Sequence, residues 1–272
     1  MADYKELESI QKFDIFDGTF ESIKDNLFMR LFNKHNLPLN IKVEDVPHID
    51  YIDLVITFSI EERTYFDGIR GIYSYLITNK DVEMLNLDKD TLKEFAMKNL
   101  VNKNSARIET ISQHIFRSHI FSPLTRLTNN MMTTVQVEGP KTQQHPSIFE
   151  GNQFGPIPIV ENYSEDTKDI LLISNRTQTF ASVNFVMPDV LDEVYNKFNE
   201  NFYIIPSSVH ELICIKSSYA TDNGNKPEKQ VIEDLEDMVE QINDVVHKNA
   251  FDILSYNIYY RVHDDNCTMI IT

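Results

Sequence analysis

The chain has 272 residues, of which 42% are hydrophobic, and a formal net charge of −17. This length and apolar content are sufficient for a large packed core. The negative charge, with no cluster of Lys and Arg against it, argues against direct binding to nucleic acid or to anionic membranes. Only 7 glycines are present, and the glycine-rich loops that cradle phosphate groups do not occur in the sequence.

The cysteines and the apolar runs indicate the compartment. Cys214 and Cys267 are the 2 cysteines of the chain, too few for a disulfide framework, so we expect a reducing cytoplasm. The first residues, MADYKELESIQKFD, are acidic and polar, unlike a signal peptide. Apolar runs such as 54–58 are too short to span a bilayer, which predicts a soluble cytoplasmic protein.

The first part of the chain is predicted to contain both helices and strands. Apolar residues recur at helical spacing from Phe20 onwards, until Pro38 ends the pattern. The run YIDLVITFSI is apolar and β-branched, as in a buried strand, and carries Asp53 as its one charge. The predicted elements are an arm or short helix at 1–16, a helix at 17–36, strands at 51–60 and 69–78 with a charged link between them, a turn at 79–81, and helices at 91–101 and 106–120.

The middle of the chain contains its clearest irregular segment. A short helix at 124–132 and a strand at 133–138 precede residues 139–166, which hold four prolines and three glycines. Turn residues at this density predict a long surface loop or a junction. We therefore predict an N-terminal α+β lobe at 1–138, an irregular loop or junction at 139–167 and a C-terminal α+β lobe at 168–272.

The second half of the chain is organised around residues 203–215. This stretch has two apolar, β-prone runs, YII and VHELICI, joined by Pro206-Ser207-Ser208. The other predicted elements are a hairpin of strands at 169–174 and 179–186, helices at 188–201 and 228–249, and strands at 253–262 and 267–272. Several hairpins among helices favour an α+β fold with two lobes, in which mixed or antiparallel sheets are flanked by helices.

Short blocks along the sequence resemble a known family. The blocks are Asn26–Leu31, Val46–His48, Tyr51–Leu54, Ile77–Asn79, Leu172–Asn175 with Ala181-Ser182, and Ile205–Glu211. Their order and spacing over residues 20–262, apart from 102–168, are similar to an uncharacterised bacterial domain family of low-GC Gram-positive bacteria and their mobile elements. This family is a domain of unknown function, so the resemblance implies a set of positions and not an activity.

The bend at 206–211 holds the main polar cluster. Ser207, Ser208, His210 and Glu211 are the residue types of a nucleophile beside a base, which makes them candidate catalytic residues. On a strand, however, Glu211 would point away from the face that Ser208 and His210 share, and no GxSxG elbow exposes a serine. We favour a turn in which hydroxyl groups bind backbone N–H groups and the imidazole is hydrogen-bonded.

A second polar group lies at 47–53. His48, Asp50 and Asp53 would form a metal or acid-base site if His210 or Glu211 approached them from the other lobe, so His48 and Asp53 join the catalytic candidates. One histidine among scattered carboxylates is also typical of a turn with a charge pair. We favour that interpretation and predict neither a metal nor a cofactor.

The helix predicted at 228–249 has the most regular pattern in the chain. Val231, Leu235 and Val239 belong to an apolar stripe at helical spacing. The outer face is acidic and comprises Glu233, Glu236, Asp237, Glu240 and Asp244. A charged helix face is normally solvated, but it is also a surface with which an acidic protein binds a basic groove.

Three kinds of function are compatible with these features. The first is a non-catalytic acidic protein-binding module of a bacterial mobile element or phage, acting through a protein partner. A particular version is a phage-encoded inhibitor of a host nucleic-acid-binding or defence protein. The alternatives are a hydrolase that uses His210 with His48 and a carboxylate, and a small-ligand sensor with a site at the lobe interface. The sequence leaves the partner and the oligomeric state open.

Overall fold

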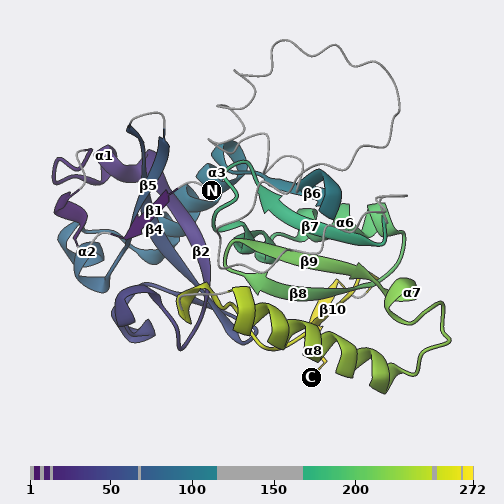
Figure 1. Cartoon of the computed structure of the whole chain (residues 1–272). Helices are drawn as coiled ribbons and strands as arrows, with labels where there is room; N and C mark the ends of the chain where they lie inside the picture. The colour runs from purple at the N-terminus through teal and green to yellow at the C-terminus, as the bar shows by residue number, and fades with distance from the viewer. Residues whose placement is uncertain are drawn as a thin grey trace, which may run out of the picture. The chain divides into compact units, whose positions relative to one another are not determined.

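The computed structural model describes residues 3–6, 9–12, 15–66, 69–114, 168–246, 250–264 and 266–271. Within these residues the chain forms two β-sheets with helices packed beside them (Figure 1). One sheet is mixed and the other is antiparallel throughout. The α+β class predicted from the sequence is therefore confirmed.

The first sheet is built from the N-terminal part of the chain. Its strand order is β1 (Asp3–Glu6), β5 (Ile69–Leu76), β4 (Leu54–Phe66) and β2 (Leu27–Asn33), and β3 (Ile49–Tyr51) also pairs with β4. β1 runs parallel to β5, and the other pairs are antiparallel. β4 is 13 residues long, which lets one strand pair with β2, β3 and β5.

The second sheet takes one strand from the N-terminal half and five from the C-terminal half. Its order is β11 (Cys267–Ile270), β10 (Tyr259–Val262), β8 (Phe202–Ser208), β9 (Glu211–Lys216), β7 (Ile170–Asn175) and β6 (Ala106–Thr110). Each of these pairs is antiparallel.

Helices of several lengths connect and cover the strands. The α-helices are α1 (Phe20–Ile23), α2 (Asn79–Met84), α3 (Lys89–Lys103), α6 (Pro188–Phe198), α7 (Ser217–Ala220) and α8 (Glu228–Val246). The 3-10 turns are η1 (Ile10–Lys12), η2 (Lys24–Asn26), η3 (Pro38–Asn40), η4 (Val43–Asp45), η5 (Ala181–Val186) and η6 (Ala250–Asp252).

Two hydrophobic clusters hold these elements together. The larger one joins apolar side chains of both sheets with those of α3 and α6. In the smaller cluster, Val231, Leu235 and Val239 of α8 pack against Tyr203 and Ile205 of β8. Side chains alternate between the faces of a strand, so β8 contributes to both clusters. Figure 1 shows α8 lying along the sheet that contains β8 and β9.

The segment from Leu27 to Asn33 is a strand, although the spacing of its apolar residues predicted a helix. The predicted helix at 17–36 is therefore wrong beyond the short turns α1 and η2. The first six positions of β2 are all buried. A strand covered on both faces reads as a continuous apolar run, which periodicity cannot distinguish from a helix.

Three further elements differ from the predictions. Residues 106–110, predicted as helix, form β6, and the predicted arm at 1–16 contains β1, because each segment pairs with a strand distant in sequence. The predicted turn at 79–81 begins α2 instead. There the Thr78 hydroxyl accepts a hydrogen bond from the Asp81 amide and the Asp81 carboxylate accepts one from Thr78, which is a capping box.

Strand ends also differ in the second half of the chain. Residues 181–186, predicted as the second strand of a hairpin, form η5, and residues 253–258 precede β10 instead of belonging to it. β4 continues to Phe66, through most of the predicted link. α3, α6 and α8 are confirmed, with Asp88 as the N-cap of α3. The elements predicted at 115–166 lie outside the described residues.

The two sheets belong to one compact unit, composed of Met1–Ile111 and Thr167–Thr272. The pairing of β6 with β7 joins the N-terminal half of the chain to the second sheet. The predicted lobe boundaries at 138 and 167 fall outside the described residues and stay a prediction.

Candidate functional site

The bend singled out in the sequence is a β-hairpin with a bulge. Pro206 and Ser207 lie in β8, opposite the single residue Leu212, between the register pairs Ile205–Ile213 and Ser208–Glu211. A bulge leaves backbone unpaired, which suits a proline because it has no N–H to donate. The predicted connection at 206–208 is thus part of the strand, and the turn consists of residues 209 and 210.

His210 is held by main chain on one side of its ring and by a carboxylate on the other. Its Nδ1 accepts a hydrogen bond from the Phe180 amide at 3.1 Å, and its Nε2 lies 3.5 Å from Asp252 Oδ1. Because Nδ1 accepts, the neutral ring carries its proton on Nε2, facing Asp252. The carbonyl of His210 accepts from the Ala181 amide. The imidazole therefore ties η5 to the hairpin.

The serine and glutamate beside His210 occupy different settings. The Ser208 hydroxyl is buried and accepts the His210 amide at 3.0 Å, which is the local hydroxyl-to-backbone bond expected for this bend. Glu211 lies directly across the hairpin from Ser208 and is half-buried. For Ser207 the structure describes only its place in β8. The catalytic roles considered for Ser207, Ser208, His210 and Glu211 stay predictions.

Phe180, the residue bound to His210, has a left-handed backbone (φ 51°, ψ 33°) although it is a large aromatic residue. Such a conformation is disfavoured for residues with a β-carbon and persists only where the surroundings hold it. Asn175 supplies much of that support: its Nδ2 donates to the Thr179 carbonyl at 2.7 Å, and its Oδ1 accepts the amides of Thr177 and Thr179. Asn175 is fully buried, and these three hydrogen bonds hold the backbone of residues 177–179 in place.

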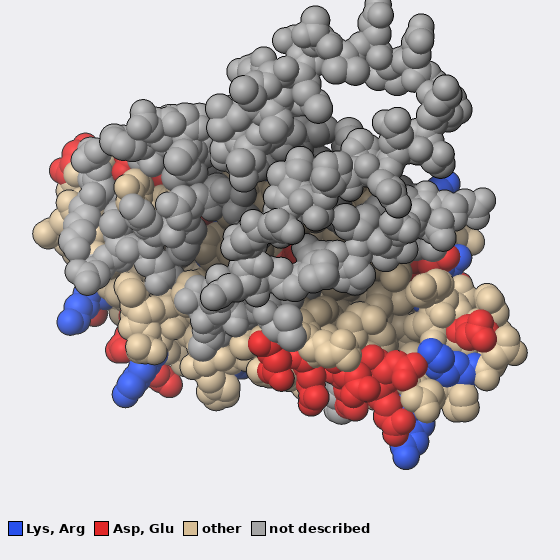
Figure 2. All heavy atoms as spheres, viewed as in Figure 1, with Lys and Arg blue, Asp and Glu red and all other residues tan. Residues whose placement is uncertain are grey.

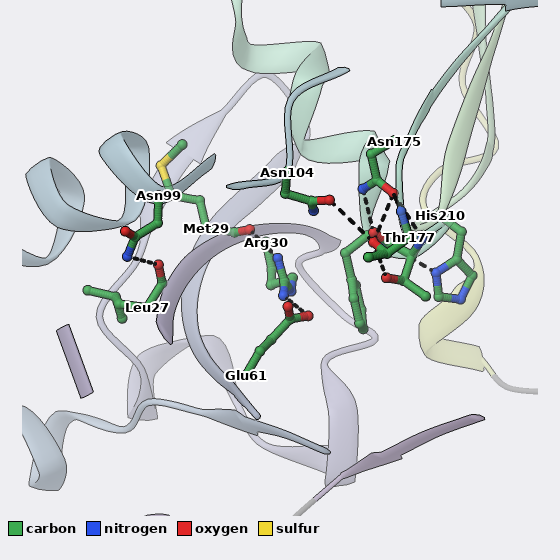
Figure 3. A network of polar contacts seen from close by, with 11 residues as sticks. Leu27, Met29, Arg30, Glu61, Asn99, Asn104, Asn175, Thr177 and His210 are labelled. Carbon is green, nitrogen blue, oxygen red and sulfur yellow. Dashed lines mark hydrogen bonds and ion pairs between the residues drawn. The ribbon is translucent and has the colours of Figure 1, made fainter. Parts of the chain in front are cut away.

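The Phe180 ring covers a buried ion pair of the first sheet. Arg30 Cζ lies 4.5 Å from the centre of that ring, within the range of cation–π attraction. The Arg30 guanidinium pairs with the Glu61 carboxylate, and neither side chain is open to solvent. Figure 3 shows this pair, the Asn175 loop and His210 as parts of one polar network.

The face of the first sheet that carries Arg30 holds a strip of buried polar side chains among apolar ones. Arg30 lies opposite Thr57, and alternation along β4 places Ser59 and Glu61 on the same face. Ser74, opposite Glu61 on β5, extends this strip. Arg30 Nε and Thr57 Oγ1 have no hydrogen-bond partner among the described residues. The other face of the same strands is apolar and belongs to the larger core.

The residues predicted at 47–53 have partners of their own. Asp53 lies in the tight turn between β3 and β4, so it is not embedded in a strand as predicted. It accepts hydrogen bonds from Ser255 (3.0 Å), Asn257 (2.9 Å) and the Tyr259 hydroxyl (2.7 Å). Burial raises the pKa of Tyr259, which keeps that hydroxyl protonated and able to donate. Asp53 thus joins the first sheet to the segment that enters β10.

His48 and Asp50 each bind a local partner. His48 Nδ1 lies 2.9 Å from the Val46 carbonyl, to which it donates. The Lys34 ammonium hydrogen-bonds to Asp50 at 2.8 Å and holds the pKa of that carboxyl below its usual value. The partners of His48 and His210 lie in separate segments of the chain, so these contacts do not support a site shared by the two imidazoles.

The acidic face of α8 lies on the surface. Glu233, Asp237, Glu240 and Asp244 are exposed and Glu236 is half-buried. Figure 2 shows Asp and Glu side chains gathering where α8 runs in Figure 1. Lys229 is the one basic residue among the 19 of this helix, and it pairs with Glu233 at 3.5 Å. Most of the carboxylates on this face therefore have no cation beside them on α8.

Two absences apply to the described part of the chain. It contains no group of three or more His, Cys, Asp or Glu side chains placed to hold a metal ion. None of its helices combines the length and the apolar character needed to cross a membrane.

Sequence reasoning missed three residues at the centre of the network, Arg30, Glu61 and Phe180. Glu61 begins the run EERTYFDG, which predicted a charged link and not a strand. The signal for Arg30 was a charge inside an otherwise apolar run, LFMRLFN. Buried charges are rare unless paired, so this run predicts a buried partner once it is assigned as a strand. The helix predicted around Arg30 concealed this signal. For Phe180 we find no signal in the sequence.

The fold and the site define an α+β protein with two sheets and a buried polar network, in which side chains form hydrogen bonds to backbone groups. A family model described as a family of unknown function, DUF5688, matches residues 2–261, and the chain belongs to this family. The resemblance to a domain of unknown function is thus confirmed. No curated protein and no solved structure matches the chain.

Proposed function

We propose that this protein is a non-catalytic binding module that contacts a protein partner through the acidic face of α8. The observation that carries the proposal is the exposure of four carboxylates on that face, with Lys229 as the one basic residue of the helix. Neighbouring like charges repel one another, and a basic partner surface relieves that repulsion. The engagement of His210 by the Phe180 amide supports a structural role for the polar network.

A narrower form of the proposal concerns the biological setting. The sequence resemblance points to bacterial mobile elements or phages, where an acidic protein can inhibit a host nucleic-acid-binding or defence protein. Such a partner has a basic groove, and a chain with net charge −17 complements it. Binding of this kind weakens steeply as salt rises, because the attraction acts between exposed charges.

Comparative affinity capture tests the proposal. The full chain and a variant with Glu233→Gln, Asp237→Asn, Glu240→Gln and Asp244→Asn are immobilised, exposed to lysate of the organism that encodes the chain, and compared by quantitative mass spectrometry. We expect a basic protein that the original chain captures and the variant does not. Its capture should fall as salt rises from about 50 mM to about 300 mM, as the Debye length shortens.

A matched control removes the same number of exposed carboxylates elsewhere, with Asp45→Asn, Glu83→Gln, Asp90→Asn and Glu94→Gln. It should capture the same partner as the original chain. Equal capture by the α8 variant, or capture that does not change with salt, would show that the acidic face is not the binding surface.

A further inference from the structure

Among the described residues, the last strand of the second sheet has an open edge. β11 pairs with β10 on one side, and no other strand of the described chain lies on its outer side. The Ile271 amide donates to the Ile258 carbonyl at 3.1 Å, which fixes the alternation of this antiparallel ladder. The backbone groups of Met269 therefore point towards β10. Those of Thr268 and Ile270 point outward, where another strand would pair.

Apart from its short length of 4 residues, this edge lacks the features by which sheet edges normally avoid pairing. The sequence CTMI contains no charge and no proline, and its register with β10 has no bulge. Met269 and Ile270 are 42% and 36% exposed, and they point to opposite faces of the strand. An added strand would cover apolar surface on both faces as well as satisfy backbone groups.

The charges around β11 indicate what kind of strand fits. α8 packs over β8, which is two strands from β11 and therefore about 10 Å away. Ile271 packs into the same cluster as Val231 and Leu235 of α8. A second copy of this chain at the edge would bring another acidic helix close to α8. A segment rich in Lys and Arg would instead be attracted by it.

We propose that β11 accepts an extended, basic segment of the protein partner as an added strand, antiparallel or parallel to Cys267–Ile270. This inference rests on the proposed function and specifies how the partner is recognised. Main-chain hydrogen bonds to Thr268 and Ile270 supply affinity, and apolar side chains of the partner cover Met269 and Ile270. Lys and Arg side chains of the segment are attracted electrostatically by the carboxylates of α8.

The first experiment uses a defined probe, a short labelled peptide of alternating lysine and valine. Its binding to the full chain is measured by fluorescence anisotropy, and amide hydrogen exchange is followed by NMR. We expect binding that slows exchange of the Thr268 and Ile270 amides and leaves the Met269 amide, already bonded to β10, nearly unchanged. A glutamate–valine peptide has the same strand propensity with the opposite charge and should not bind.

Substitutions in β11 test its outer edge separately from the acidic face of α8. Ile270→Pro removes an outward N–H and keeps the bonds to β10, so the lysine–valine peptide should bind about tenfold more weakly or worse. Ile270→Lys blocks the edge by its charge. It replaces the proline variant in the binding measurement if the proline variant does not show a cooperative thermal transition. Met84→Lys, at an exposed apolar residue of α2, is the control and should bind as the original chain does.

The possible results distinguish this inference from the proposed function. If the lysine–valine peptide binds more weakly to the edge variants and also to the α8 variant, the result supports both the added strand and the acidic face as a binding surface. Unchanged affinity for both edge variants, with loss in the α8 variant, overturns the added strand and leaves the acidic face as the binding surface. Failure of the peptide to bind the original chain, or exchange protection at β6 instead of β11, also overturns the added strand.

Discussion

The main-chain amide of Phe180 donates a hydrogen bond to Nδ1 of His210 over 3.1 Å. One ring nitrogen thereby stabilises a left-handed backbone at a large aromatic residue, and the Phe180 ring in turn covers the Arg30 guanidinium. The hairpin of the second sheet and the ion pair of the first sheet are thus coupled through a single residue. Changes at His210 should be detected as changes in stability.

Removing the His210 imidazole should destabilise the fold. His210→Ala removes the imidazole that accepts from the Phe180 amide, and the loss of such a hydrogen bond costs about 0.5–1.5 kcal/mol. His210→Asn restores an acceptor near the position of Nδ1 and should recover part of that loss. Urea unfolding of the three proteins measures the differences. An Ala variant as stable as the original chain would contradict the role assigned to His210.

Removing one partner of the buried ion pair Arg30–Glu61 should cost more stability than removing both partners. Arg30→Met or Glu61→Leu alone leaves an uncompensated buried charge, so each should lower the unfolding free energy by about 3–5 kcal/mol. The double variant removes both charges and should recover most of the loss. A double-mutant cycle by denaturant unfolding gives the coupling energy. Additive effects of the two single changes would show that the pair is not coupled as the contact indicates.

Asp53 should stabilise the junction between the β3–β4 turn and the segment entering β10. Asp53→Ala leaves the donors of Ser255, Asn257 and Tyr259 without their carboxylate and should lower the unfolding free energy by about 2 kcal/mol or more. Hydrogen exchange in β10 should accelerate relative to β9. The matched control is Asp45→Ala, an exposed carboxylate, which should change neither stability nor exchange.

The N-cap of α3 should make stability depend on pH. The Thr91 amide, followed by the Thr91 hydroxyl, donates to the Asp88 carboxylate and lowers its pKa. The folded-state pKa is below the unfolded value, so the charged carboxylate contributes stability above about pH 4. That contribution is lost as pH falls through the folded-state pKa.

Asp88→Asn isolates this effect, because it keeps a capping oxygen that does not titrate. The stability difference between the original chain and Asp88→Asn should be present at neutral pH and should disappear in acid. Thermal unfolding across pH measures it. A difference that stays constant from neutral to acidic pH would show that the carboxylate charge does not contribute.

The elements predicted correctly are those whose pattern had one interpretation. α8 has an apolar stripe at helical spacing with an acidic outer face, α6 begins at Pro188, and in α3 the apolar residues Leu92, Ala96 and Leu100 recur at helical spacing. Each of these signals is local to its own helix, so the sequence alone determined it.

The elements predicted wrongly depend on partners far along the chain. LFMRLFN is a strand because β4 pairs with it and both its faces are covered, and ARIET is a strand because it pairs with β7. At the site, the hydroxyl-to-backbone bond of Ser208 follows from the turn chemistry of its own residues. The link from His210 to Phe180, and from there to Arg30, joins three segments distant in sequence, which no local pattern reveals.

The pairing of β6 with β7 determines where the intervening chain leaves and returns. Thr110 lies opposite Leu171, so the chain leaves and re-enters the sheet on adjacent strands. Two paired strands fix only the ends of the chain that joins them, and closing a longer flexible connection costs only a logarithmic increment of entropy. Evolution can therefore lengthen, shorten or exchange the sequence at this position while both sheets keep their register.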